Sequence, residues 1–311
     1  MSHPPTGGRK PQHGDKPVQR IFSMGENMNN KVYEIVNEKI LQSLEKGIIP
    51  WHRPWNSEHG GMPINAVSGN YYHGSNVWLL TGISLADGLP NYWCTPKQAM
   101  GKGWNIKGQH CTAIVTFWKF LEHVDIDSDG KEKKKTIPML RFFPVLNASQ
   151  CEGWEKTEPT GQPEIADHPS NYENGPTINH VFDSNKAFYS PSTDTVSLPE
   201  KSQFISENHY YATLYHELAH STGHESRLNR KSPDAIAAFG GESYAKEELV
   251  AELGSAYVCM QLHIDNDKLT ENTAAYITSW SNALKQEPRM FVSAAGAAEK
   301  AANMILGVSN E

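Results

Sequence analysis

The sequence predicts an α+β protein with two domains, and three observations carry this prediction. The chain has 311 residues, more than one hydrophobic core usually serves, and 38% of them are hydrophobic. The first half alternates helical segments with short extended segments rich in aromatic residues, which is typical of a mixed fold with a mainly antiparallel sheet. The second half is mostly helical in its periodicity and contains the segment H-E-L-A-H at residues 216–220.

Charge separates the same two halves. The formal net charge is −7, but residues 151–311 contain 23 acidic and 11 basic residues, whereas residues 25–150 contain 11 acidic and 13 basic ones. We therefore expect the halves to have different partners. The chain has no run of 18 apolar residues, its first 20 residues lack the apolar core of a signal peptide, and its four cysteines are scattered without a C-x-x-C pair. A cytoplasmic protein with reduced thiols is expected.

Residues 25–150 are predicted to form the first domain, preceded by a tail. Residues 1–24 are rich in Pro, Gly and His, which predicts disorder. Apolar residues at near-helical spacing predict a helix over residues 30–47. The other expected elements are a helix at 77–85, a short helix beginning at Pro96, strands at 92–95, 104–106, 112–120 and 140–146, and a charged mobile hairpin loop at 125–135.

Residues 178–311 are predicted to form the second domain, a mostly helical one with a small sheet. The polar, Pro- and Gly-rich stretch at residues 151–177 reads as a linker. Two short strands are expected on either side of a turn at residues 192–194. Helices are expected around H-E-L-A-H, around residues 247–253, and at about 270–286 and 292–306.

The segment H-E-L-A-H matches the zinc-protease pattern H-E-x-x-H. On a helix, His216 and His220 project from the same face, and two imidazoles there can hold one Zn²⁺ at about 2.0–2.1 Å each. Glu217 is then placed to take a proton from a metal-bound water. The alternative is a surface helix with two histidines. The apolar segment at residues 211–215 favours a buried helix, where unpaired His and Glu side chains are unfavourable.

A catalytic zinc site needs a third protein ligand. One extension of the motif would place a histidine three residues after Gly223, but Ser226 stands there. The segment at residues 247–253 resembles the gluzincin pattern N-E-x-x-S-D. By that resemblance Glu248 is the third ligand and Glu252 is the acid that fixes a histidine tautomer, with Glu252 as the rival ligand. The alternative is a solvated acidic helix face, which is our interpretation of Glu247.

Aromatic and basic residues interleave in the first half, where six of the eight tryptophans lie between residues 25 and 150. Single-stranded nucleic acid is bound by such mixtures, because rings stack on bases and basic groups follow phosphates. The alternative is that these rings form the core of the sheet domain. The small positive balance argues against a tight duplex binder. The candidate single-stranded DNA contacts are Trp51, Arg53, Trp55, Tyr72, Asn76, Lys97, Lys107 and Trp118.

Stretches in order along residues 30–305 carry a resemblance to a known family. In the first half they are Leu44-Glu45-Lys46-Gly47, Pro50-Trp51, Pro54-Trp55, Asn65-Ala66, Gly69, Tyr72, Gly74, Asn76, Thr95, Gln98-Ala99 and Phe117-Trp118-Lys119. In the second half they are Ala187-Phe188-Tyr189-Ser190-Pro191, Asp194, residues 216–224, Arg227-Leu228, Arg230 and residues 247–252. Together they resemble the ArdC-type antirestriction proteins, whose N-terminal domain is shared with plasmid TraC-type primases.

The resemblance implies a single-stranded DNA-binding domain joined to a zincin-like metallopeptidase domain that holds one Zn²⁺ or a similar divalent ion. It also implies a plasmid-borne protein that protects incoming DNA from host restriction during conjugation, so restriction-system components become candidate protein substrates. One alternative is a non-catalytic single-stranded DNA-binding protein whose metal site is structural or vestigial. A priming protein is disfavoured, because no acidic triad for nucleotide-bound metals stands out in the sequence.

Overall fold

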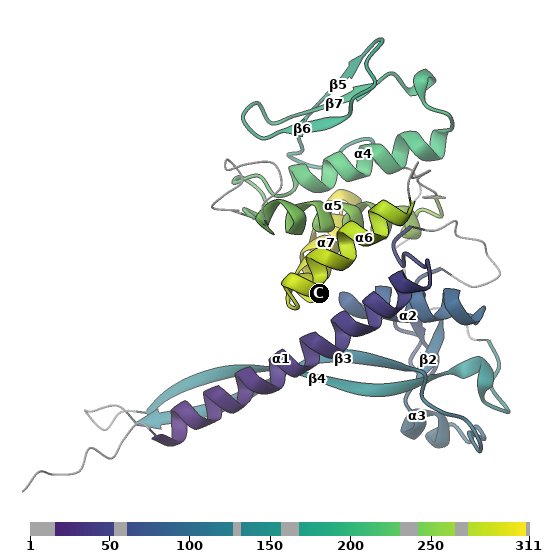
Figure 1. Ribbon diagram of the computed structural model, residues 1–311, viewed down its shortest axis with the longest axis vertical. Coiled ribbons are helices and arrows are strands. Elements are labelled where there is room, and N and C mark those ends of the chain that lie inside the picture. The colour runs from purple at the N-terminus through teal and green to yellow at the C-terminus, as the bar shows by residue number, and fades with distance from the viewer. Residues whose placement is uncertain are drawn as a thin grey trace, which may run out of the picture. The chain divides into compact units, whose positions relative to one another are not determined.

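The computed structural model describes residues 16–52, 61–126, 132–156, 168–230, 242–264 and 273–308 (Figure 1). The chain divides into two compact units. The first contains the beginning of the chain up to Val32, together with residues 117–141, and the second contains residues 33–116 and 142–311. Each unit is described by itself.

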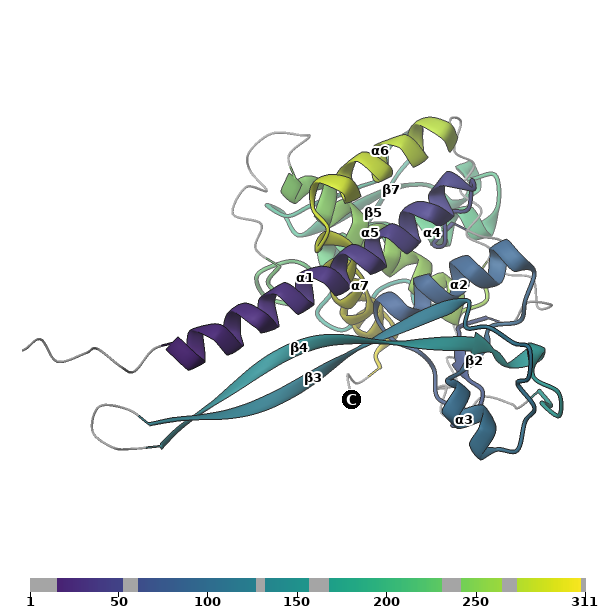
Figure 2. The same cartoon turned by 60° about the horizontal axis from the view of Figure 1, so that its bottom comes forward.

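The first unit combines the start of helix α1 (Lys16–Glu45) with the outer parts of strands β3 (Ala113–Ile126) and β4 (Glu132–Asn147). Figure 2 shows β3 and β4 as a long twisted pair. Asn29 joins helix and strand, because its amide donates to Pro138 O at 3.2 Å and its oxygen accepts from Leu140 N at 2.7 Å.

Two sequence expectations are corrected in this unit. Helix α1 begins at Lys16, so helix occupies part of the segment that was expected to be a disordered tail. Strands β3 and β4 take up both ends of the charged run at 125–135, which was expected to be a loop. Alternate residues of a strand point to the same face, and Glu132 and Lys134, which share one, are exposed, so charged side chains are compatible with a strand here.

The second unit contains the rest of a four-stranded sheet in the order β1-β2-β4-β3, with β1 (Ile64–Asn65) parallel to β2 (Tyr92–Cys94) and β2 antiparallel to β4. Helix α2 (Ser75–Asp87) and the short helix α3 (Pro96–Gly101) accompany it. Helix α3 starts at a capping box in which Thr95 and Gln98 bond each other's backbone amides. The strand expected at 104–106 is only a single bridge between Asn105 and Glu152.

The same unit contains a three-stranded sheet in the order β5-β7-β6. Figure 1 shows helix α4 between this sheet and helix α5, and the contacts of α4 with β6, β7 and α5 agree with it. Helices α4 and α5 approach closely at Gly254, where a Cβ atom would lie only 3.1 Å from Ala219 Cβ. The elements are β5 (Thr177–Val181), β6 (Phe188–Ser190), β7 (Thr195–Pro199), α4 (Glu207–Ser221), α5 (Glu242–Gln261), α6 (Thr273–Gln286) and α7 (Met290–Leu306), with 3₁₀ turns η1 (Ala148–Gln150) and η2 (Lys201–Gln203).

The hydrophobic core of the second unit joins residues from both halves of the chain. Trp51 is completely buried, and its ring lies 6.4 Å from that of Trp280 and 5.9 Å from that of Phe291. Asn37 donates to the Leu284 carbonyl at 2.7 Å in a buried position. The packing therefore crosses the limit at residues 151–177 that composition suggests between the two domains.

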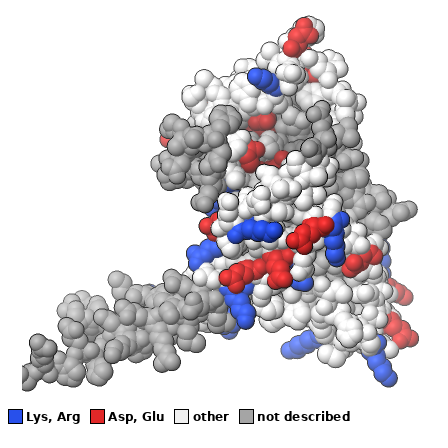
Figure 3. All heavy atoms as spheres, viewed as in Figure 1, with Lys and Arg blue, Asp and Glu red and all other residues white. Residues whose placement is uncertain are grey.

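Acidic and basic side chains are interspersed over the face drawn in Figure 3, and the described atoms on that face form no broad surface of one sign. Among the residues that the structure describes, no helix has the length and apolar character needed to span a membrane.

Candidate metal centre

Helix α4 presents the two motif histidines toward α5. It begins at Ser206, whose hydroxyl accepts from His209 N and so caps the helix. Leu214 and Leu218 are fully buried and fix the rotation of the helix. His216 and His220 then lie one turn apart on the face toward α5, with only 15% and 16% of their side-chain surfaces exposed.

Three potential metal-binding side chains from the two helices converge. Nε2 of His216 and Nε2 of His220 are 3.2 Å apart, and they lie 3.6 and 3.5 Å from the two carboxylate oxygens of Glu248. Bonds of about 2.0–2.2 Å in a tetrahedron hold ligand atoms about 3.3–3.6 Å apart, so this His₂Glu set fits one zinc-sized ion. Among the described residues, His216, His220 and Glu248 form the one group of three suited to a metal ion.

Glu217 lies beside these donors on the same helix and is 7% exposed. Its charge acts on the site, as the pKa of His220 shows. Burial alone lowers that pKa, but the neighbouring carboxylates Glu247, Glu248 and Glu217 outweigh burial and raise it above its ordinary value. A largely buried carboxyl group therefore stands one residue after His216, where the motif predicts a proton acceptor.

The interpretation of Glu247 as a solvated residue is wrong. Its Oε1 lies 3.6 Å from Nδ1 of His220, and Arg230 donates to both of its oxygens at 2.7 and 3.2 Å. Burial raises the pKa of Glu247, but hydrogen bonding to His220 and Arg230 prevails and lowers it below the ordinary range. Sequence reasoning also passed over Tyr244, one turn before Glu248, whose pKa is raised by burial and then by the charge of Glu248.

Glu252 connects α5 to the first half of the chain. Its Oε2 lies 3.2 Å from Nε2 of His52, which is also 3.1 Å from the hydroxyl of Tyr276. The same hydroxyl accepts from Trp51 Nε1 at 3.0 Å. The contact of Glu252 with His52 does not test whether Glu252 fixes the tautomer of a ligand histidine, so that role stays a prediction.

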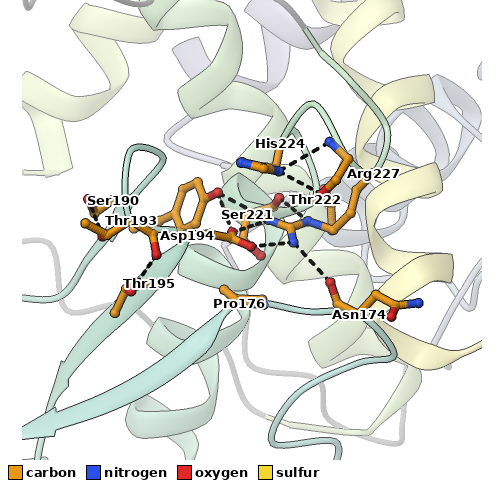
Figure 4. A network of polar contacts seen from close by, with 12 residues as sticks. Asn174, Pro176, Ser190, Thr193, Asp194, Thr195, Ser221, Thr222, His224 and Arg227 are labelled. Carbon is orange, nitrogen blue, oxygen red and sulfur yellow. Dashed lines mark hydrogen bonds and ion pairs between the residues drawn. The ribbon is translucent and has the colours of Figure 1, made fainter.

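A network around Arg227 holds the three-stranded sheet to the end of α4 (Figure 4). Arg227 pairs with Asp194 through both terminal nitrogens and donates to Ser221 O at 2.8 Å and to Asn174 O at 3.1 Å. Its side chain is only 4% exposed. The hydrogen bond from Arg227 is the main cause that lowers the pKa of Asp194. This bidentate pair fixes the turn between β6 and β7 beside the metal-binding helix.

The structure corrects part of the candidate DNA surface. Trp51 is buried in the core and has no face free for a base. Tyr72 is half-buried with its hydroxyl donating to Trp93 O, and burial raises its pKa to about 12. Asn76 bonds the backbone of Thr116 in both directions, at 2.8 and 2.6 Å. These polar groups are engaged in holding the fold together.

Other candidates remain accessible. Lys97 and Lys107 are exposed, and Trp118 on β3 is 43% exposed. Phe120 and Val124 are also exposed and lie two and six residues beyond Trp118, so the three share one face of the strand; we call them the β3 row. Trp118 and Phe120 lie in the strand expected at residues 112–120, whereas Val124 lies beyond its expected end. Arg53 and Trp55 lie outside the described residues.

Comparison with protein-family models matches residues 30–146 to the N-terminal domain of the anti-restriction factor ArdC and residues 172–297 to a zincin-like metallopeptidase family. The crystal structure of the metal-free antirestriction ArdC protein from the R388 plasmid superposes with a TM-score of 0.70 at 32% identity. The superposition covers 89% of this chain and 99% of the R388 protein. The chain belongs to the ArdC family of antirestriction proteins. The predicted α+β fold and zincin-like domain are thereby confirmed.

A second structure of the R388 protein and a primase are also similar to this ArdC-family chain. The Mn(II)-bound structure of the R388 ArdC protein is 31% identical with a TM-score of 0.68, and it covers 88% of this chain and 96% of that one. A DNA primase TraC of Escherichia coli is 37% identical over 308 residues, covering 92% of this chain. The chain spans only 21% of the length of that primase, so the match does not extend to the whole enzyme.

Proposed function

We propose that this protein is a metal-dependent peptidase that binds single-stranded DNA and protects incoming conjugative DNA from restriction. The main support for peptidase activity is the convergence of His216, His220 and Glu248 beside Glu217. Two histidines and a glutamate are a ligand set used by catalytic zinc. The Mn(II)-bound relative supports a divalent ion in the family, and Zn²⁺ remains our choice for this donor set.

Each residue of the site has a defined task in peptide hydrolysis. A divalent ion held by the three donors would polarise a peptide carbonyl and lower the pKa of a coordinated water. The Glu217 carboxylate takes a proton from the water that attacks the peptide carbonyl. It then returns this proton, as general acid, to the amine that leaves when the peptide C–N bond breaks. Strand β6 forms one edge of the three-stranded sheet and contacts α4, so it offers backbone groups to which an extended peptide could pair.

The β3 row supports the DNA-binding part of the proposal. Alternate residues on a strand are about 6.6–6.8 Å apart, so Trp118 and Phe120 can each meet a separate base of an extended strand. Stacking on such rings contributes about 1–3 kcal/mol per base. Residues 25–150 contain 13 basic and 11 acidic residues, a small positive balance that offers little to duplex phosphates and favours single strands.

The two activities together suggest how the protein would act. Bound to the entering single strand, the peptidase would meet proteins that assemble on the same DNA, and restriction-system components are the substrates we propose. The alternative is a protein that shields DNA without hydrolysis. The β3 row favours this alternative, because stacking on it requires no metal ion.

The test compares full-length wild type, Glu217→Gln and the control Glu225→Gln, which changes an exposed glutamate five residues beyond His220. Glu217→Gln should keep the metal and the fold and lose hydrolysis of a protein substrate, whereas Glu225→Gln should match wild type. Transfer of unmodified conjugative DNA into a restricting recipient is measured in parallel. Full protection by Glu217→Gln would establish the shielding alternative, and undiminished hydrolysis would remove Glu217 from the mechanism.

A further inference from the structure

We propose that Glu247, held by Arg230, is a positioning residue that orients the His220 imidazole for metal binding. The inference rests on the proposed metal site but concerns residues outside the H-E-x-x-H ligand set. It also gives Glu247 a function that its neighbour Glu248 cannot perform, because the two carboxylates meet opposite sides of the same ring.

The two ring nitrogens of His220 have different surroundings. Nε2 lies 3.2 Å from Nε2 of His216 and 3.5 Å from Glu248 Oε1, so it faces the other donors. Nδ1 lies 3.6 Å from Glu247 Oε1. A neutral imidazole carries one proton, and a carboxylate beside Nδ1 favours the tautomer with the proton there. The Nε2 lone pair is then directed at the metal position.

Glu247 can select this tautomer only if its own carboxylate is fixed. Arg230 donates through Nη2 to Oε1 at 2.7 Å and through Nε to Oε2 at 3.2 Å. This fork arrangement sets the plane of the carboxylate as well as its distance. It also occupies both oxygens of Glu247, which leaves Glu248 as the carboxylate directed at the donors.

Arg230 is anchored in turn to the helix that carries His220. Nη2 donates to Ala219 O and Nη1 to Thr222 Oγ1, both at 2.7 Å. A Cβ atom at position 223 would lie 3.0 Å from Nη2, so Gly223 leaves the space that the guanidinium occupies. Arg230 therefore fixes the position of the Glu247 carboxylate on α5 relative to the backbone of Ala219, the residue before His220 on α4.

The pair Arg227–Asp194 provides a matched structural control. It is also a bidentate arginine–carboxylate pair, and it also ties the end of α4 to a neighbouring element, in this case the three-stranded sheet. Its removal should weaken the fold. The other partners of Arg227 are Ser221 O, Asn174 O and the Tyr189 hydroxyl, so removal of the pair should leave the affinity for metal unchanged.

The experiment measures the Zn²⁺ affinity of full-length wild type, Glu247→Ala, Glu247→Gln and Asp194→Asn by competition with a chelator. The urea midpoint of each metal-free protein is recorded as well. Glu247→Ala should bind Zn²⁺ about 10–100-fold more weakly, as is usual when the partner of a ligand histidine is removed. Glu247→Gln should recover part of the loss, because an amide oxygen can occupy the same place beside Nδ1 but without the full negative charge. Asp194→Asn should lower the urea midpoint and change the affinity less than about twofold, since it leaves the partners of His220 in place.

The visible absorption of the Co²⁺-loaded proteins gives a second readout, since it depends on ligand geometry and not on overall stability. It should change in Glu247→Ala and stay the same in Asp194→Asn. Affinity and spectrum of Glu247→Ala equal to wild type would overturn the inference, as would equal losses in Glu247→Ala and Asp194→Asn. If Glu247→Ala does not fold, Glu247→Gln compared with Asp194→Asn decides by the same criterion. A wild type without Zn²⁺ binding would instead refute the proposed metal site itself.

Discussion

Replacing Trp51 or Trp118 by alanine should separate the core of this protein from its DNA surface. Trp51 is fully buried against Trp280 and Phe291 and donates to the Tyr276 hydroxyl at 3.0 Å. Truncating a buried tryptophan costs about 3–5 kcal/mol of folding free energy. With a urea m-value of about 2 kcal/mol/M, the midpoint of Trp51→Ala should fall by roughly 2 M.

Trp118 should behave in the opposite way. Because it is 43% exposed on β3, Trp118→Ala should change the folding free energy by about 1 kcal/mol or less. It should weaken binding of a single-stranded oligonucleotide by about 1–3 kcal/mol, with little change in salt dependence. The assays are urea unfolding followed by circular dichroism and fluorescence anisotropy of a labelled oligonucleotide. A midpoint shift below about 0.5 M for Trp51→Ala would refute the burial argument, and unaltered DNA affinity of Trp118→Ala would refute the stacking argument.

Three further substitutions test individual contacts. Gly254→Ala places a Cβ atom 3.1 Å from the Ala219 side chain of α4. It should therefore destabilise the fold by about 1–3 kcal/mol in urea unfolding and weaken Zn²⁺ binding. If neither the stability nor the Zn²⁺ affinity changes, the close approach of α4 and α5 is contradicted. The hydrogen bond to Glu299 is the main cause that raises the pKa of His73 in the folded protein. The stabilisation of the fold by this contact is therefore complete below the unfolded pKa of His, about 6.5, and is lost as the pH rises through the folded pKa. The difference in urea midpoint between wild type and His73→Gln should therefore be larger at about pH 5.5 than at about pH 8.5, and equal differences would contradict this assignment. Asn76→Ala should cost about 1–3 kcal/mol through its lost hydrogen bonds to β3 and leave DNA affinity unchanged, which separates it from a DNA contact by the same two assays.

Local periodicity explains which parts of the fold could be predicted from the sequence. The spacing of His216 and His220 and the buried leucines beside them are properties of one helix, so both the helix and the shared face followed directly. The strands around the turn before α4 were predicted for the same reason, since β6 and β7 form an antiparallel pair from consecutive segments. Elements defined by neighbours in the chain need no tertiary information.

The role of Glu247 depends on how two helices cross, and a sequence does not specify that. Adjacent residues on a helix differ in direction by about 100°, so either Glu247 or Glu248 could have faced water. The close contact at Gly254 sets the distance between α4 and α5 and places His220 between the two carboxylates. The resemblance to a pattern with a four-residue period drew attention to Glu248 and Glu252 and left Glu247 interpreted as a solvated residue.

The burial of Trp51 was missed for a related reason. The interleaving of aromatic and basic residues suggested rings exposed to DNA, but the partners of Trp51, Trp280 and Phe291, lie more than 200 residues further along the chain. A pairing over such a sequence distance leaves no local signal. The same packing explains why composition, which changes near residue 150, does not mark the limit of the compact unit.

Two arginines in the loop after α4 explain why the metal-binding helix keeps its place between a sheet and another helix. The last carbonyls of a helix have no partner within it. Arg227 donates to Ser221 O and pairs with Asp194 on the sheet side, while Arg230 donates to Ala219 O and pairs with Glu247 on the α5 side. Each guanidinium thus satisfies a carbonyl of α4 and fixes one neighbouring element to it. Because His220 lies between these two carbonyls, the same pair of contacts sets its distance both from the edge strand proposed for the substrate and from the third ligand.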